Sequence, residues 1–156
     1  MLIDAINQVT GTTEAYSSAI PEPYTFIPEG ERAISLPDGS ITSTFLVMFG
    51  RPARDTGLES ERDDQITASQ RLHLLNSTQV QRKIQQGPGM QALLHSARGP
   101  EDMVGGLYFA ILSRPPTADE RSIFAAYARR GTPNRGAAAA DLAWALINSA
   151  EFLYRH

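Results

Sequence analysis

The residues best suited to chemistry lie in a charged segment at residues 51–64. Arginine side chains bind sulfate, phosphate or carboxylate groups through paired hydrogen bonds. The candidate binding residues are therefore Arg51, Arg54, Glu61 and Arg62. Opposite charges alternate through this segment, so the same residues can instead pair with one another and fix an irregular stretch of chain. The alternation favours this structural interpretation, and the binding interpretation stays open.

The carboxylates of this segment do not match a catalytic or metal-binding spacing. Glu59 and Glu61 could act as an acid and a base, but glycoside hydrolysis needs two carboxylates at a defined separation across a substrate cleft. The series Glu59, Glu61 and Asp63 lacks the glycine and the distal glutamate of an EF-hand calcium loop. We therefore assign neither a catalytic residue nor a metal ligand here.

The histidines and the single tryptophan give no stronger signal. His73, His95 and His156 are far apart in the sequence and form no H-E-x-x-H motif. The sequence has no glycine-rich phosphate loop, and we expect no cofactor. Trp144 lies in an apolar stretch, which favours a place in the core over a role as a ligand platform.

The composition excludes several classes of function. The 156 residues include no cysteine, which excludes disulfides, Cys-ligated zinc, iron–sulfur clusters and covalent haem attachment through this segment. The net charge of −3 and the pI near 5.6 argue against nucleic acid as a partner. No apolar run approaches the roughly 20 residues that cross a bilayer, and Asp4 interrupts the first residues before a signal-peptide core could form.

Helix-start signals recur after residue 66. Each places Asn or Thr three residues before Gln or Glu, which is the spacing of a capping box. The pairs are Thr67 with Gln70, Asn76 with Gln79, Thr117 with Glu120 and Asn148 with Glu151. The second and fourth signals share an Asn-Ser sequence, which an internal duplication or a shared capping solution would explain, and we favour the shared capping solution.

Apolar residues at helical spacing complete a mainly α fold. We predict a bundle of about six short helices over residues 65–156. Its apolar faces are expected to include Leu72, Leu74, Leu75, Val80, Ile84, Met90, Leu93, Leu94, Val104, Leu107, Tyr108, Ile111, Leu112, Ile123, Phe124, Tyr127, Leu142, Trp144, Leu146 and Ile147.

Residues 1–64 are predicted to form an irregular arm with a short first helix at residues 2–9. Prolines and glycines interrupt any longer element in this arm. Residues 32–36 and 44–49 have strand-like composition and flank a turn sequence, so we expect at most one small β pair.

The arm is predicted to wrap over the helices, within a single domain of residues 1–156. The reason is that Tyr16, Tyr24, Phe26 and Ile27 are apolar or aromatic side chains that need burial.

Several motifs together resemble one protein family. They are LIDAINQVTG at residues 2–11, FGRPARDT at 49–56, ESER at 59–62, TASQRLHLLN at 67–76, LSRPPT at 112–117 followed by Glu120, and WALINSAEFL at 144–153. In this order they resemble the C-terminal region of the DUF1553 proteins of planctomycete-type bacteria, which are also called PSD1 proteins. The resemblance covers nearly the whole chain.

The resemblance implies that the chain is the C-terminal part of a larger, exported or periplasmic protein. Relatives commonly carry an upstream DUF1549 domain and often a c-type-cytochrome-like domain, and their gene sets also encode sulfatase-like proteins. The family is uncharacterised, so it supplies no catalytic residues. Many relatives have Cys-Glu-Cys-Glu-Arg where this chain has Leu58-Glu59-Ser60-Glu61-Arg62, so a redox or metal role of those cysteines cannot operate here.

We therefore expect a non-catalytic docking or structural module, whose partners are other domains of the parent protein or a separate protein. One alternative is the ligand-binding or enzymatic part of a system that processes polysaccharides, including sulfated ones. Another is an accessory to a c-type cytochrome domain located elsewhere in the parent chain.

Overall fold

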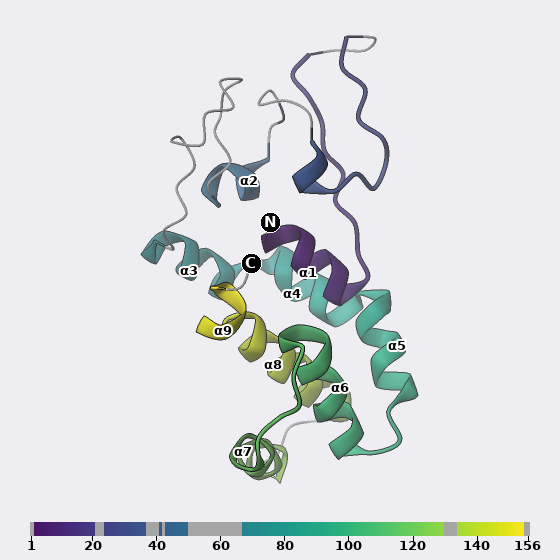
Figure 1. Cartoon of the computed structure of the whole chain (residues 1–156), viewed down its shortest axis with the longest axis vertical. Helices are drawn as coiled ribbons and strands as arrows, with labels where there is room; N and C mark the ends of the chain where they lie inside the picture. The colour runs from purple at the N-terminus through teal and green to yellow at the C-terminus, as the bar shows by residue number, and fades with distance from the viewer. Residues whose placement is uncertain are drawn as a thin grey trace. The chain divides into compact units, whose positions relative to one another are not determined.

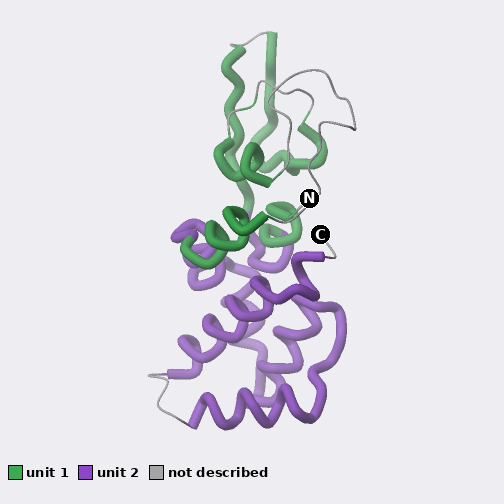
Figure 2. Tube along the Cα trace, turned by 90° about the vertical axis from the view of Figure 1, so that its left-hand side faces the viewer, with its two compact units in different colours: residues 1–7, 13–76 green, residues 8–12, 77–156 purple. Residues whose placement is uncertain are grey.

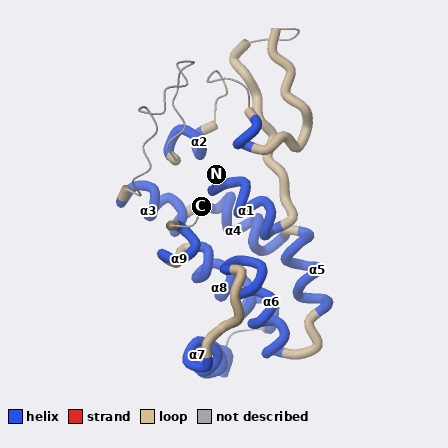
Figure 3. The backbone as a smooth tube through the Cα atoms, viewed as in Figure 1, coloured by secondary structure: helices blue, strands red, loops and turns tan. Residues whose placement is uncertain are grey.

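Short helices dominate the computed structural model, which describes residues 2–20, 24–36, 41, 43–49, 67–129 and 134–154. The mainly α prediction is confirmed (Figures 1 and 3). The elements are α1 (Leu2–Thr10), the 3₁₀ helix η1 (Ala33–Ser35), α2 (Thr44–Met48), α3 (Ala68–Asn76), α4 (Thr78–Gln86), α5 (Pro88–Ser96), α6 (Pro100–Leu112), α7 (Ala118–Arg129), α8 (Arg135–Ile147) and α9 (Ala150–Leu153).

The chain divides into two compact units, which Figure 2 colours separately. Unit 1 consists of Met1–Asn7 and Thr13–Asn76, and unit 2 consists of Gln8–Thr12 and Ser77–His156. Unit 1 therefore includes the first part of α1 together with η1, α2 and α3. Unit 2 includes α4 to α9. The prediction of a single domain stays a prediction.

In unit 1, the two segments with strand-like composition contain the helices η1 and α2, so among the described residues they do not form the small β pair that the sequence allowed. The buried carboxylate of Asp4 accepts hydrogen bonds from the backbone N–H groups of Ala33 (2.7 Å) and Ile34 (3.1 Å), and these bonds stabilise the start of η1. At α2, the Ser43 hydroxyl accepts a hydrogen bond from Leu46 N–H, which is a helix N-cap. A distant carboxylate in the first segment and a local cap in the second thus favour helix over strand.

The β pairing among the described residues is limited to an isolated antiparallel bridge between Ser18 and Ile41. Ile3 and Ile6 of α1 are buried, and so are Phe45, Leu46 and Leu74. The prediction that all four arm residues are buried is wrong for Tyr24 and Phe26, which are 84% and 68% exposed.

The predicted apolar face of α3 is also wrong in part. Leu74 is fully buried, whereas Leu72 and Leu75 are 62% and 40% exposed. Gln70 occupies the buried place that an apolar residue would otherwise take, because its amide donates to the Met48 carbonyl oxygen at 2.7 Å. A hydrogen-bonded glutamine therefore sets the orientation of α3.

Unit 2 is organised around α6 and α8, which pack along one another, while α9 contacts both. The predicted buried face of α6 is confirmed: Val104, Leu107, Tyr108, Ile111 and Leu112 are all buried. Its start is also confirmed, since Pro100 occupies the first turn with Glu101 and Asp102 beside it. Acidic side chains are favourable there because they face the positive end of the helix dipole.

The predicted apolar face of α7 is only partly confirmed. Phe124 is buried, but Ile123 is 68% exposed and Tyr127 is 42% exposed. The Tyr127 hydroxyl donates to an Asp141 carboxylate oxygen at 2.6 Å, which gives this tyrosine a polar role at the surface.

Two of the predicted capping boxes form as written. Thr67 and Gln70 exchange hydrogen bonds between side chain and backbone at the start of α3, and Thr117 and Glu120 do the same at the start of α7. Each pair provides acceptors for two N–H groups that have no partner inside the helix.

The two Asn-Ser joints differ from the prediction by one residue. Ser77 and Ser149 are the N-caps, and their hydroxyls accept hydrogen bonds from Val80 N–H and Phe152 N–H. The preceding asparagines end the previous helix instead. Asn76 donates to the Leu72 carbonyl and Asn148 to the Trp144 carbonyl, and each bond spans four residues.

Glycines allow two backbone segments of unit 2 to meet directly. Gly11, which ends α1 with φ +68°, lies against Gly89 at the start of α5. A Cβ atom on Gly11 would lie 2.6 Å from the Gly89 backbone nitrogen, and a Cβ atom on Gly89 would lie 2.9 Å from the Gly11 nitrogen. The Gly-Pro-Gly sequence at 87–89 is therefore a packing contact as well as a helix boundary.

We predict that Asp4→Ala lowers the free energy of unfolding by about 1–3 kcal/mol, because two backbone N–H groups of η1 lose their acceptor. Urea denaturation followed by circular dichroism measures this change. Asp4→Asn keeps one acceptor oxygen and should lose less. Unchanged midpoints for both variants would contradict the role given to Asp4.

Candidate functional site

The four candidate binding residues from the sequence, Arg51, Arg54, Glu61 and Arg62, lie outside the described residues. Their assignment as a binding site, and the alternative of an internal charge network, therefore both stay predictions. The candidate site that the structure describes is a different group of charged residues, in unit 2.

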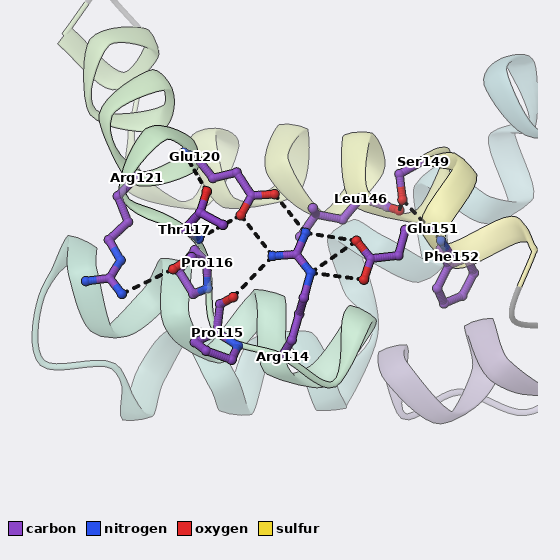
Figure 4. Close-up of polar contacts among 10 residues, drawn as sticks. All are labelled: Arg114, Pro115, Pro116, Thr117, Glu120, Arg121, Leu146, Ser149, Glu151 and Phe152. Atoms are coloured by element: carbon purple, nitrogen blue, oxygen red, sulfur yellow. Dashed lines mark hydrogen bonds and ion pairs between the residues drawn. The ribbon is translucent and has the colours of Figure 1, made fainter.

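This group is the Arg114 cluster, which consists of Arg114, Glu120 and Glu151 (Figure 4). Arg114 lies between α6 and α7, Glu120 in the first turn of α7 and Glu151 in α9. Two nitrogens of Arg114 contact Glu120, at 2.8 Å from Nη2 to Oε1 and 2.9 Å from Nη1 to Oε2. Nε and Nη2 contact Glu151 at 2.8 to 3.1 Å. One guanidinium thus joins two carboxylates, each through more than one hydrogen bond.

The local sequence explains how Arg114 reaches both carboxylates. Ser113 ends α6 in the left-handed conformation, with φ 56°, and its N–H donates to the Phe109 carbonyl. This turn redirects the chain just before Arg114. Arg114 then donates to the Pro115 carbonyl at 3.2 Å, and its guanidinium carbon lies 5.3 Å from the centre of the Tyr108 ring. The loop therefore presents Arg114 over a buried aromatic residue of α6.

Glu120 has two roles in this cluster. Its Oε2 atom accepts from Thr117 N–H at 2.7 Å, which completes the capping box, and both of its oxygens accept from Arg114. The hydrogen bonds from Arg114 hold the pKa of Glu120 down, to about 2 from its ordinary value of 4.5, with a further contribution from Thr117. Glu120 is therefore ionised at neutral pH.

The pKa values of Arg114 and of the neighbouring Tyr108 are shifted as well. Hydrogen bonds with Glu120 and then Glu151 raise the pKa of Arg114 above its ordinary value. Burial raises the pKa of Tyr108, and the negative charge of Glu120 adds to this effect, while Arg114 opposes it. The raised pKa of Arg114 favours the charged state that its ion pairs need, and the raised pKa of the neighbouring Tyr108 favours its neutral phenol. The arrangement stabilises contacts between α6, α7 and α9.

Proton transfer near neutral pH requires a group whose pKa lies near neutrality. The pKa of Glu120 lies far below neutrality, and the pKa of Arg114 lies far above it. The cluster can therefore orient and connect helices, but its geometry does not suit general acid–base chemistry.

Sequence reasoning quoted these residues only as parts of motifs and missed their association. The signal that could have suggested it is one arginine just before the Thr117 capping box and a glutamate in each of two separate helix-start motifs. The Arg114 and Glu151 positions are 37 residues apart, and nothing in the sequence alone indicates which distant charges meet.

The histidines of the chain do not form a metal site among the described residues. In unit 1, the His73 ring lies 6.0 Å from both Phe45 and Phe49 in edge-on contacts, and its buried Nε2 atom has no hydrogen-bond partner. His95 is exposed, and His156 lies outside the described residues. Among the residues that the structure describes, no group of three or more His, Asp or Glu side chains is placed to hold a metal ion.

Two pockets lie on unit 2. One, of about 470 Å³, lies between α5, α6 and the start of α7, where Arg98 and Arg121 face a region that also contains Glu101 and Asp102. The other, of about 330 Å³, lies between α4 and α8, where Trp144 and Asp141 contribute to the wall. Trp144 is half-buried and lines this second pocket, so it is not a purely internal residue.

No family model, curated protein or solved structure matches this chain. Within the described part of the chain, no helix combines the length and the apolar character that crossing a bilayer requires.

We predict that Arg114→Lys lowers Tm by several degrees, because a lysine ammonium cannot form paired hydrogen bonds with two carboxylates. Arg114→Ala should lower Tm further, since Glu120 and Glu151 would then face each other without a cation. Thermal melts followed by circular dichroism measure both changes. Arg98→Lys, at an exposed arginine of the same unit, is the control, and an equal effect of Arg98→Lys and Arg114→Lys would contradict the cluster's role.

The low pKa of Glu120 predicts an acid-dependent loss of stability. A carboxyl group with a depressed folded-state pKa contributes stability above its ordinary pKa and loses it as pH falls toward the folded-state value. The difference in unfolding free energy between wild type and Glu120→Gln should therefore be largest above pH 4.5 and shrink as pH falls to about 2. Urea titrations at intervals between pH 6 and about 2 test this expectation, and a difference that does not vary with pH would refute it.

Proposed function

We propose that this chain is a non-catalytic docking module of a larger exported protein that is similar to the DUF1553 proteins. Its partners are other domains of that parent protein. The observation that carries the proposal is the exposure of aromatic side chains in unit 1: Tyr24 is 84% exposed and Phe26, two residues further, is 68% exposed. Clustered exposed aromatic residues are typical of surfaces that bind other proteins.

The chemistry of the Arg114 cluster supports a structural role. The ion pairs of the Arg114 cluster connect the chain's own helices, and Glu120 is ionised at neutral pH. Such a cluster gives a rigid scaffold and does not provide an acid or a base. The connected helices of unit 2 and the exposed aromatic side chains of unit 1 each fit docking better than catalysis.

Exposure of Tyr24 and Phe26 costs free energy in isolation, because large apolar surface is in contact with water. Burial against a partner removes this cost, and aromatic residues at the centre of an interface commonly contribute most of its binding free energy. We therefore place the docking contact at residues 24–26 and commit to another domain of the parent protein as the occupant.

We predict that Phe26→Ser weakens binding of this chain to the separately expressed remainder of the parent protein at least about tenfold, as expected for an aromatic residue central to an interface. Isothermal titration calorimetry measures the dissociation constant. The matched control is Phe109→Ser in unit 2, because Phe109 is 67% exposed and Phe26 is 68% exposed.

The control should bind like the wild type. Absence of measurable binding by the wild-type chain, or equal weakening by the two substitutions, would overturn the proposal. Circular dichroism of both variants establishes that they are folded.

A further inference from the structure

The pocket between α4 and α8 has a lining whose chemistry points to a ligand. It has a volume of about 330 Å³, and its wall comes from Gln81, Ile84 and Gln85 of α4 and from Ala140, Asp141 and Trp144 of α8. Both helices belong to unit 2 and pack against each other. This volume lies at the small end of the range typical for ligand pockets.

Trp144 does not fit a role in packing alone. It is half-buried, and its indole Nε1 atom is buried without a hydrogen-bond partner. When tryptophan serves in a core, its N–H group usually finds an acceptor. The buried Nε1 atom therefore adds no hydrogen bond within the fold, while the side chain contributes to the pocket wall.

The polar groups of the wall suit hydroxyl groups. Gln81 and Gln85 are exposed, lie one helical turn apart, and each carries an amide that can both donate and accept hydrogen bonds. The Asp141 carboxylate is oriented by the Tyr127 hydroxyl, which donates to Oδ2 at 2.6 Å. An oriented carboxylate is a strong acceptor for further hydroxyl donors.

The charge of the lining narrows the class of ligand. Among the described residues that form this wall there is no arginine or lysine, and Asp141 is the acidic residue. An anion would therefore meet a carboxylate without a compensating cation. A flat aromatic ring beside amides and one carboxylate instead suits a ligand with an apolar face and several hydroxyl groups at its edge.

We propose that the α4–α8 pocket binds a neutral sugar unit, with Trp144 as the stacking surface and Gln81, Gln85 and Asp141 as the hydrogen-bonding groups. The site is separate from the docking contact proposed at residues 24–26 and from the charged segment at residues 51–64. A ring of sugar carbons with its C–H groups packs on the indole face, while its hydroxyl groups bond to the amides and the carboxylate.

The single tryptophan makes the test direct. Trp144 is the only tryptophan in the sequence, so the indole fluorescence of the whole chain reports on this pocket. The emission is recorded while the intact chain is titrated separately with glucose, galactose, mannose, xylose, N-acetylglucosamine and cellobiose. We expect a saturable change in intensity or wavelength with at least one of these sugars.

Substitutions in the wall identify the site. The double variant Gln81→Ala with Gln85→Ala removes two exposed amides and should raise the dissociation constant at least about tenfold, because the sugar loses hydrogen bonds to both. The matched control is Gln86→Ala, an exposed glutamine on the same helix outside the pocket wall, which should bind like the wild type. Circular dichroism establishes that both variants are folded.

Three results would overturn the proposal. One is the absence of a saturable change with every sugar of the panel. Another is an unchanged dissociation constant in the double variant. The third is a response to choline chloride or sodium sulfate in place of the sugars, which would assign the pocket to an organic cation or to an anion.

Discussion

The helices of this chain are short, and that shortness governs most of its polar contacts. A helix leaves four N–H groups at its start and four C=O groups at its end without partners inside the helix. In helices of nine residues, such as α3, α4 and α5, these end groups are nearly half of the backbone N–H and C=O groups. The fold is stable only where side chains or neighbouring backbone provide partners for them. Caps are therefore as important here as the apolar core.

The Asn-Ser joint is an efficient solution to this constraint. In α3–α4 and again in α8–α9, the asparagine side chain donates to a carbonyl at the end of one helix, while the serine hydroxyl accepts an N–H at the start of the next. Two helices can then follow each other with no intervening loop. The capping solution is the same in both places, with serine as the cap in place of the asparagine expected from the sequence. Glu120 likewise provides a partner for a helix end, because its carboxylate completes the cap of α7 and also binds Arg114.

The sequence predicted the features that depend on neighbours along the chain. The helices after residue 66, the start of α6 and the capping boxes at Thr67 and Thr117 depend mainly on residues close together in the sequence, and these features were predicted correctly. The errors arise where distant residues decide. Asp4 converts residues 33–35 into a 3₁₀ helix across 29 residues of sequence, and a buried Gln70 leaves Leu72 exposed.

The site was less predictable than the fold for the same reason. The wall of the α4–α8 pocket combines positions from two helices, and helical spacing on each gives no information about their pairing. Trp144 was expected in the core because its neighbours along the chain are apolar. Its place at the edge of a pocket follows from the packing of α8 against α4.

Helix α9 has a consequence for the order of folding. It has four residues, and a helix of this length does not form in isolation because the first turn costs more conformational entropy than one hydrogen bond returns. It exists because Phe152 is buried and Glu151 binds Arg114, which lies 37 residues earlier. Both contacts require α6 and the following turn to be in place. We therefore expect helix α9 to form late in folding, so that its contacts act mainly on the rate of unfolding.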